Sequence, residues 1–455
     1  MLKSKSINMI EGPVFLPIIK YAIPLVVAGI LQIFFNAADL AIVGNFAGES
    51  ATIATASVGA TGAFISLIVQ TVMGLANGVN VSLSRALGAR DSDKTTRIVH
   101  TAVLLSLICG VLVAIAGLLI SPFAMDITKC PPEARGKAII YLRIYFLGCP
   151  GIFLYNFGSA ILRTNGDTRR PLNFLIIAGV SNVVLNYIFV KYLGMDADGV
   201  ALATALTQYL AAFLTIRCLI HGTDDTRLYV RKLRICKDEF IAILRYGLPS
   251  GASNAIYSLS NITIQSAVNS YGASAVAGSS TSSSLEGFVM AAIGAFNSAA
   301  IAFGGQNVGA RRPERLKRII LSCITISVIV TLVLGFGIFL IGDPLYRLYV
   351  PKDDAAVSFA GERASVMLTT YFIPAFSGIF SALAQVFGYS FLITAISIFG
   401  IFGFRMIWME FVYPVWTEIT TVYLCYPISW SIILVGNVVV FLIAYRNFTR
   451  KGILK

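Results

Sequence analysis

Long stretches nearly free of charged side chains constrain this chain more than any other feature. Twelve such stretches lie between charged or turn-rich breaks, each long enough to cross the ~30 Å hydrocarbon core of a bilayer as a helix. They cover residues 16–44, 52–82, 97–124, 137–163, 170–193, 198–220, 240–269, 275–305, 315–342, 362–388, 391–415 and 419–446. Only 13% of the residues are charged, against ~25% in soluble domains. We therefore predict an all-α integral membrane protein with twelve transmembrane helices.

The basic residues fall mostly on one side of these predicted spans. With the N-terminus in the cytoplasm, 26 of the 35 Lys and Arg residues lie in cytoplasmic loops or tails. Eight lie outside, Arg363 among them, and only Arg405 lies within a span. Since cytoplasmic loops of membrane proteins are enriched in Lys and Arg, we predict a multi-pass plasma-membrane protein with both termini cytoplasmic. The net charge of +13 then reflects topology, and nucleic-acid binding is not expected.

The two halves of the chain repeat the same motifs in the same order. Three pairs mark the repeat: Lys20-Tyr-Ala-Ile-Pro24 with Arg245-Tyr-Gly-Leu-Pro249, Leu87-Gly-Ala-Arg90 with Val308-Gly-Ala-Arg311, and Gly166 with Gly388. Six spans per half give both halves the same orientation, and pseudo-symmetric halves around a central cleft are common in secondary transporters. We predict an N-terminal lobe over 1–220, a cytoplasmic linker over 221–239 and a C-terminal lobe over 240–455.

Signatures of several other function classes are missing from the sequence. There is no G-x-x-x-x-G-K-[ST] loop to cradle nucleotide phosphates, so an ion gradient is the expected energy source. The only two histidines, His100 and His221, lie near predicted helix ends, and the seven cysteines form no CxxC pair. We therefore expect no enzyme activity and no cofactor apart from the coupling ion.

Ionisable groups inside spans are rare and costly, so each is a candidate for function. Asp39 lies in the first span, with Asn36 three residues earlier on the same face, and Asn182 and Asn186 share a face of the fifth span. A carboxylate with amide oxygens suits a proton or Na⁺, and burial would favour the protonated form. A purely structural hydrogen-bond cluster is the alternative, and for the two asparagines the two readings are equally supported.

The second half offers Glu286, in Ser282-Ser-Ser-Leu-Glu286, and Arg405 at a similar predicted depth. These two residues form either a structural ion pair between the eighth and eleventh spans or a site for substrate or a second ion. The serine-rich surroundings permit close helix packing or line a wet cleft, and the sequence does not separate these alternatives.

The ordered motifs resemble the multidrug and toxic compound extrusion (MATE) transporters over nearly the whole chain. The resemblance rests on Lys20-Tyr-Ala-Ile-Pro24, Asn36-Ala-Ala-Asp39, Leu87-Gly-Ala-Arg90, Arg163-Thr-Asn-Gly-Asp167, Val308-Gly-Ala-Arg311 and Tyr426-Pro-Ile-Ser-Trp430. It implies two six-helix lobes that export organic cations in exchange for Na⁺ or H⁺. It also implies a cation-coupling cluster of Asp39, Asn182 and Asn186, and a second-lobe carboxylate at Glu286. Some relatives have Asp where this chain has Asn186, which leaves the choice between Na⁺ and H⁺ open.

The resemblance favours an antiporter for small organic cations. We expect membrane lipid as a further partner and a monomeric protein. A flippase of the same superfamily for lipid-linked saccharides is the nearest alternative. A pyrophosphate headgroup would require several basic residues in the cavity, and only Arg405 is predicted within a span. A membrane-embedded enzyme or a channel fits the sequence less well.

Overall fold

The computed structural model describes residues 6–46, 51–128 and 130–453, and 86% of the chain is helical with no strand among these residues. Both chain ends, and Lys3, Lys5, Lys129 and Lys455 of the basic residues counted above, lie outside the described residues. This helical content confirms the predicted all-α class. The physical reason is that an apolar run within a bilayer can satisfy its backbone groups only as a helix or in a closed barrel.

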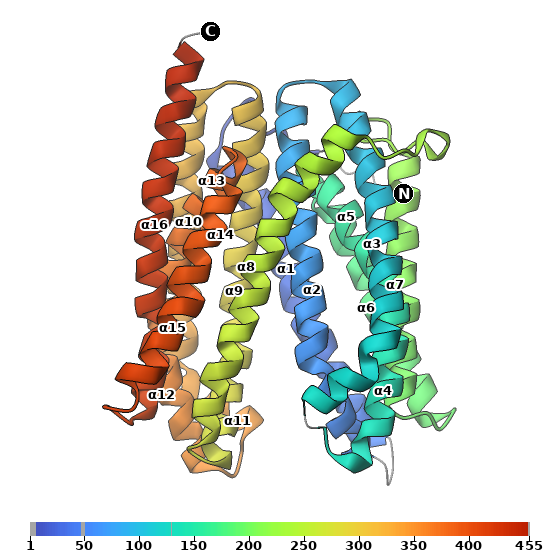
Figure 1. The fold of residues 1–455 in the computed structure, drawn as a ribbon, viewed down its shortest axis with the longest axis vertical. Helices are drawn as coiled ribbons and strands as arrows, with labels where there is room; N and C mark the ends of the chain where they lie inside the picture. The colour runs from blue at the N-terminus through green and yellow to red at the C-terminus, as the bar shows by residue number, and fades with distance from the viewer. Residues whose placement is uncertain (1–5, 47–50, 129, 454–455) are drawn as a thin grey trace. The chain divides into compact units, whose positions relative to one another are not determined.

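The helices follow the predicted spans closely (Figure 1). The first half contains α1 (Phe15–Phe46), α2 (Ala51–Gly88), α3 (Ser92–Ile127), α4 (Pro132–Leu147), α5 (Cys149–Thr164), α6 (Arg169–Lys191) and α7 (Ala197–Ile220). A short helix η2 (Val230–Lys232) precedes the second half. That half contains α8 (Lys237–Asn269), α9 (Ala273–Gly309), α10 (Pro313–Leu340), α11 (Gly342–Tyr349), α12 (Asp354–Thr370), α13 (Phe372–Val386), α14 (Ser390–Ser397), η3 (Ile398–Gly403), α15 (Phe404–Ile407), η4 (Trp408–Val412) and α16 (Ile419–Ile453).

Nine helices of the described residues are long and apolar enough to cross a membrane, and two bent pairs raise this number to eleven. The pairs are α4 with α5, bent by 43°, and α12 with α13, bent by 42°. Pro150 and Pro374 lie just after the two bends, where a missing N–H and the ring clash interrupt a continuous helix. The remaining predicted span is α8, which is 33 residues long but is interrupted by Ser, Asn and Gln side chains.

Large apolar side chains face outward from these helices. Leu119, Leu321 and Phe391 expose 76%, 68% and 80% of their surface. Contiguous exposed apolar surface of this kind is unfavourable in water but suits lipid tails. The exposed surface therefore agrees with a multi-pass membrane protein.

The predicted repeat reappears in the backbone geometry of the helix ends. Arg90 and Arg311 both adopt left-handed conformations, with φ of 56° and 54°, directly after α2 and α9. Gly166 and Gly388 have φ of 90° and 101° after α5 and α13. Matching turns at matching positions show that the sequence repeat is also a structural repeat.

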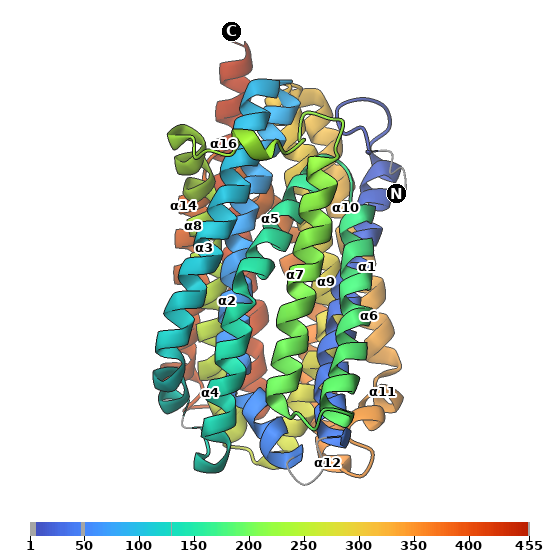
Figure 2. The same cartoon turned by 90° about the vertical axis from the view of Figure 1, so that its right-hand side faces the viewer.

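The chain divides into two units that do not follow the order of the sequence strictly. Unit 1 contains Ile30–Gly247 and the N-terminal segment that ends at Ile7, and unit 2 contains Asn8–Gly29 and Leu248–Lys455. Consequently α1 and α8 each contribute one part to each unit. In unit 1, α5 packs against α3 and α7 (Figure 2). In unit 2, α9 packs against α10, α12 and α13.

The predicted linker over 221–239 packs against unit 1. Asn165 donates to Asp224 over 2.7 Å, and Ser92 donates to Asp225 over 2.9 Å. Further along, the backbone N–H of Tyr229 donates to Nε2 of the buried His100 over 3.0 Å. The last of these bonds gives His100, eight residues after the start of α3, a structural role in holding the linker.

Candidate functional sites

Asp39, Asn182 and Asn186 form one hydrogen-bonded cluster inside unit 1. Asp39 lies on α1, and the two asparagines lie one turn apart on α6. Asn186 Nδ2 donates to Asp39 Oδ1 over 2.6 Å and to Asn182 Oδ1 over 3.2 Å. The structure therefore brings together three of the four residues that the sequence singled out for this site.

Thr204 on α7 extends this cluster and was not among the predicted site residues. Asn182 Nδ2 donates to Thr204 Oγ1 over 3.3 Å. A signal was available, because the short connection around Gly194 makes α6 and α7 antiparallel neighbours. Residues at similar distances before and after that turn, such as Asn182 and Thr204, then lie opposite each other.

Asn36 does not join the cluster. Its side chain is exposed, and its Oδ1 accepts from Gln32 one turn earlier at 3.5 Å, the limit of hydrogen bonding. Within the described part of the chain no hydrogen bond links Asn36 to Asp39. The three-residue spacing placed both residues near one face of α1, but it could not show which of them turns toward α6.

One polar atom of the cluster, Asn186 Oδ1, is buried in largely apolar surroundings without a hydrogen-bond partner among the described residues. Asn182 and Asn186 are buried and Asp39 is half-buried, beside an apolar cluster that includes Ile42, Val43 and Val190. An unsatisfied buried acceptor is unfavourable, and a hard cation with oxygen ligands would satisfy it. A proton on the carboxylate would reduce the cost of burying the charge.

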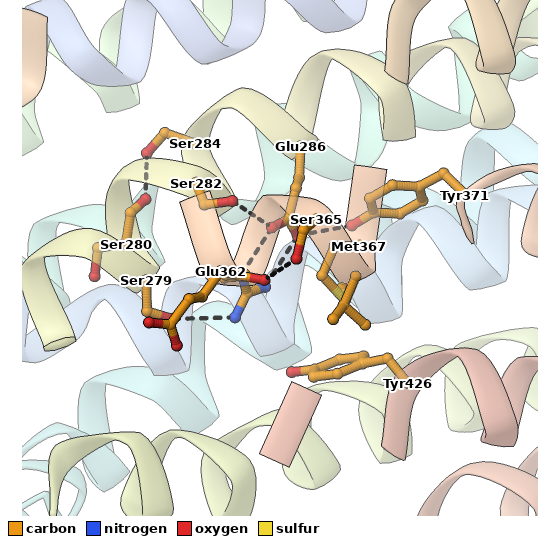
Figure 3. Close-up of polar contacts among 12 residues, drawn as sticks. Ser279, Ser280, Ser282, Ser284, Glu286, Glu362, Ser365, Met367, Tyr371 and Tyr426 are labelled. Atoms are coloured by element: carbon orange, nitrogen blue, oxygen red, sulfur yellow. Dashed lines mark hydrogen bonds and ion pairs between the residues drawn. The ribbon is translucent and has the colours of Figure 1, made fainter. Parts of the chain in front are cut away.

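Glu286 is held by three side chains in unit 2 (Figure 3). Its two oxygens accept from Arg363 Nε and Nη2 over 2.7 and 2.9 Å, a bidentate ion pair. Ser282 donates to Oε1 over 3.0 Å, and Tyr371 donates to Oε2 over 2.8 Å. Arg363 also donates to Ser279 over 3.1 Å. The serine run therefore contributes hydrogen bonds around a buried ion pair.

Arg363 corrects one prediction and resolves another. The charge pattern predicts Arg363 on the outer side of the membrane, at the edge of the run over 362–388, whereas the structure buries it on α12, nine residues after that helix begins at Asp354. The partner of Glu286 is Arg363 rather than Arg405, so the considered pair between Glu286 and Arg405 does not form. The prediction failed because the charged Glu362-Arg363 pair marks the edge of an apolar run, whereas the helix itself starts earlier.

Within the described ranges, no group of three or more His, Cys, Asp or Glu side chains could hold a metal ion.

Comparisons with known proteins agree with this architecture. A family model described as MatE matches residues 24–188 and 249–409, one segment in each half of the repeat. The probable multidrug resistance protein YoeA of Bacillus subtilis (strain 168) is 26% identical over 427 residues, which cover 90% of both chains. The FAD transporter of Shewanella oneidensis is 22% identical over 347 residues, covering 75% of this chain and 76% of that protein.

A solved structure has the same fold. The crystal structure of MATE in complex with MaL6 superimposes with a TM-score of 0.88 at 23% sequence identity, covering 98% of this chain and 99% of the other. The agreement extends over both halves of the repeat.

Proposed function

Because the chain belongs to the MatE family of multidrug and toxic compound extrusion transporters, we propose that it is a secondary active antiporter. It exports organic cations in exchange for Na⁺ or H⁺ and alternates between outward- and inward-facing states. The names of relatives such as the probable multidrug resistance protein YoeA support drug export as the direction of transport.

The observation that carries this proposal is the Asp39 cluster. A carboxylate inside a membrane span is costly unless it has a partner, and the hydrogen-bond partner of Asp39 among the described residues is the neutral amide of Asn186. Asn186 is bonded in turn to Asn182, and Asn182 to Thr204. The cluster has no fixed cation among the described residues, so a mobile one can compensate the charge. Binding of Na⁺ or H⁺ at Asp39 then favours one of the two transport states, and its release favours the other.

A flippase for lipid-linked saccharides is not favoured. Its headgroup would need several free basic side chains, and Arg363 is already neutralised by Glu286.

Ethidium efflux from proteoliposomes tests the proposal directly. We expect an imposed Na⁺ or pH gradient to drive efflux by the wild-type protein, and the gradient that succeeds names the coupling ion. Asp39→Asn keeps the size of the side chain but removes the charge that attracts the cation. Its gradient-driven efflux should fall to the level of protein-free liposomes.

Two variants serve as controls on neighbouring positions. Asn36→Ala changes an exposed residue of the same helix that lies outside the cluster. Thr207→Val changes a hydroxyl on α7 that bonds only the backbone of its own helix, at Ala203 and Thr204. Both should retain wild-type efflux. If no gradient moves ethidium, or if Asp39→Asn transports as well as the wild type, the proposed mechanism is wrong.

A further inference from the structure

Arg405 is a fully buried cation whose partners are all neutral. It lies on α15 in unit 2 and is 0% exposed. Its Nε donates to Ser429 Oγ over 3.1 Å, and its Nη1 donates to Ser260 Oγ over 3.3 Å and to Asn261 Oδ1 over 3.2 Å. Nη2 is buried and has no hydrogen-bond partner among the described residues. A buried charge without a counter-charge is strongly unfavourable, so this arrangement calls for an anion.

The acidic residues nearby do not provide that counter-charge. Both oxygens of Glu286 are taken by Arg363, and half-buried Glu362 forms no ion pair with either arginine in the described part of the chain. The ring of Tyr426 faces both guanidinium groups, at 4.3 Å from Arg405 Cζ and 5.7 Å from Arg363 Cζ. Two arginines therefore share one aromatic ring, while a single carboxylate neutralises only one of them.

The backbone around Arg405 has a feature that is frequent at functional sites. π-helical turns occur on both sides of it, in η3 (Ile398–Gly403) and η4 (Trp408–Val412). Such turns weaken the regular helical hydrogen bonding and change the direction of side chains.

One face of α8 is polar and contacts Arg405. Ser250, Asn254, Tyr257 and Asn261 recur at intervals of three or four residues, so they share one side of the helix, and each is half-buried. Asn261 bonds Arg405, and the Tyr257 ring lies 5.3 Å from Arg405 Cζ. This face also makes α8 more polar than the other long helices.

We propose that Arg405 binds the anionic group of a transported molecule, a carboxylate or a phosphate, while the rings of Tyr257 and Tyr426 contact its aromatic or apolar part. A guanidinium group with an unpartnered Nη2 offers the donor that such an anion requires. The transported molecules then include zwitterions and organic anions in addition to organic cations. This inference rests on the proposed export function for its role in transport, but the binding site itself can be tested without transport.

A matched pair of dyes separates the anionic group from the rest of the ligand. Rhodamine 6G is a cationic ethyl ester, and its hydrolysed free acid has the same ring system with an added carboxylate. Binding of each dye to the purified full-length protein is measured by fluorescence polarisation. We expect Arg405→Gln to weaken binding of the free acid by about tenfold or more, the value of a charge-assisted hydrogen bond, and to change ester binding by less than about threefold.

Asn261→Asp provides a second variant that does not depend on tolerating the loss of Arg405. It places a carboxylate within bonding distance of Arg405 with almost no change in shape, so the protein should fold at least as well as the wild type. The internal carboxylate should displace the ligand's anionic group and weaken free-acid binding by a similar factor. Thermal unfolding of both variants distinguishes a lost site from a lost fold.

Other results would overturn the inference. The proposal is wrong if the wild type does not bind the free acid, or if Arg405→Gln and Asn261→Asp weaken both dyes equally. It is also wrong if chloride raises the Tm only when Arg405 is present while free-acid binding is unchanged in both variants, because the anion would then be inorganic. Efflux of the ester in proteoliposomes tests the export function separately, so a failure of transport is not mistaken for a failure of this site.

Discussion

Glu286 and Arg405 are buried charges of the same unit in opposite circumstances. Glu286 has a full set of partners, including a bidentate arginine, whereas Arg405 has only neutral partners and a spare donor. A satisfied buried ion pair is a structural feature first, because its charges are already occupied. A buried cation without a counter-charge is better suited to bind a ligand. The geometry therefore favours a structural role for Glu286.

Neutralising Glu286 tests that structural role. Glu286→Gln preserves the shape of the side chain but leaves the Arg363 guanidinium buried without a counter-charge. We expect the free energy of unfolding to fall by roughly 3–5 kcal/mol, the usual cost of removing one partner of a buried ion pair. Thermal unfolding of the purified protein would show this as a large fall in Tm.

The double variant Glu286→Gln/Arg363→Met should recover most of this loss, because neither charge then remains unpaired. If Glu286→Gln instead unfolds like the wild type and binds cationic dyes poorly, Glu286 is a substrate anchor.

Local spacing predicted that Asn182 and Asn186 lie together, whereas the contact of Asp39 with Asn186, 147 positions away, was indicated by the family resemblance and not by any spacing. Asn182 and Asn186 lie one helical turn apart, so spacing alone shows that they share a face. Glu286 and Arg363 lie on different helices and 77 positions apart in the chain, so no local spacing indicates their pairing either. Thr204 lies between these cases, since a short antiparallel connection links it to Asn182.

At the scale of helices, hydropathy and turn residues predicted most of the fold. All twelve predicted runs correspond to helices or bent pairs of helices of the described residues, and the repeated motifs mark repeated turns. The π-helical turns of η3 and η4 were not predicted, because one extra residue per turn leaves the apolar run unchanged. Proline alone does not locate the bends, because Pro150 and Pro374 lie beside them while Pro24 and Pro249 lie inside the helices α1 and α8.

The two turn glycines allow a comparison of equivalent positions in the two repeats. Gly166 and Gly388 both have a positive φ, which costs a residue with a Cβ about 1 kcal/mol or more. A Cβ at Gly388 would meet nothing within 4 Å, whereas a Cβ at Gly166 would lie 2.7 Å from the carbonyl oxygen of Ile7. The Ile7 N–H also donates to the Gly166 carbonyl over 3.2 Å.

We therefore expect Gly388→Ala to lower the Tm modestly and Gly166→Ala to lower it clearly more. The second variant adds displacement of the N-terminal segment to the same backbone strain. Thermal unfolding and limited proteolysis of the N-terminus measure both effects. Equal Tm values for the two variants would show that the contact with Ile7 contributes nothing to stability.

At the scale of the whole molecule, the two structural units are not the two halves of the sequence. Ile18 and Tyr21 of α1 are buried in unit 2, where the Tyr21 ring packs edge-on against Phe303 at 5.7 Å. Ile243 of α8 is buried in the core of unit 1, where a Cβ at Gly78 would lie 2.2 Å from the Ile243 carbonyl oxygen. Each unit thus completes its core with half a helix that belongs, in sequence, to the other half.

This exchange predicts how the chain behaves when it is cut in the linker, where Thr223 is exposed. A fragment of residues 1–222 lacks the part of α8 that fills the core of unit 1, and a fragment of residues 223–455 lacks the part of α1 that belongs to unit 2. Each fragment expressed alone therefore exposes a groove lined by residues that are fully buried in the intact chain. We expect each to be aggregated or degraded in size-exclusion chromatography, whereas co-expressed fragments should co-purify as one monodisperse species and transport ethidium. A fragment of residues 1–222 that is monodisperse and unfolds cooperatively by itself would contradict this expectation, because the exchanged half-helix would then be dispensable for the core of unit 1.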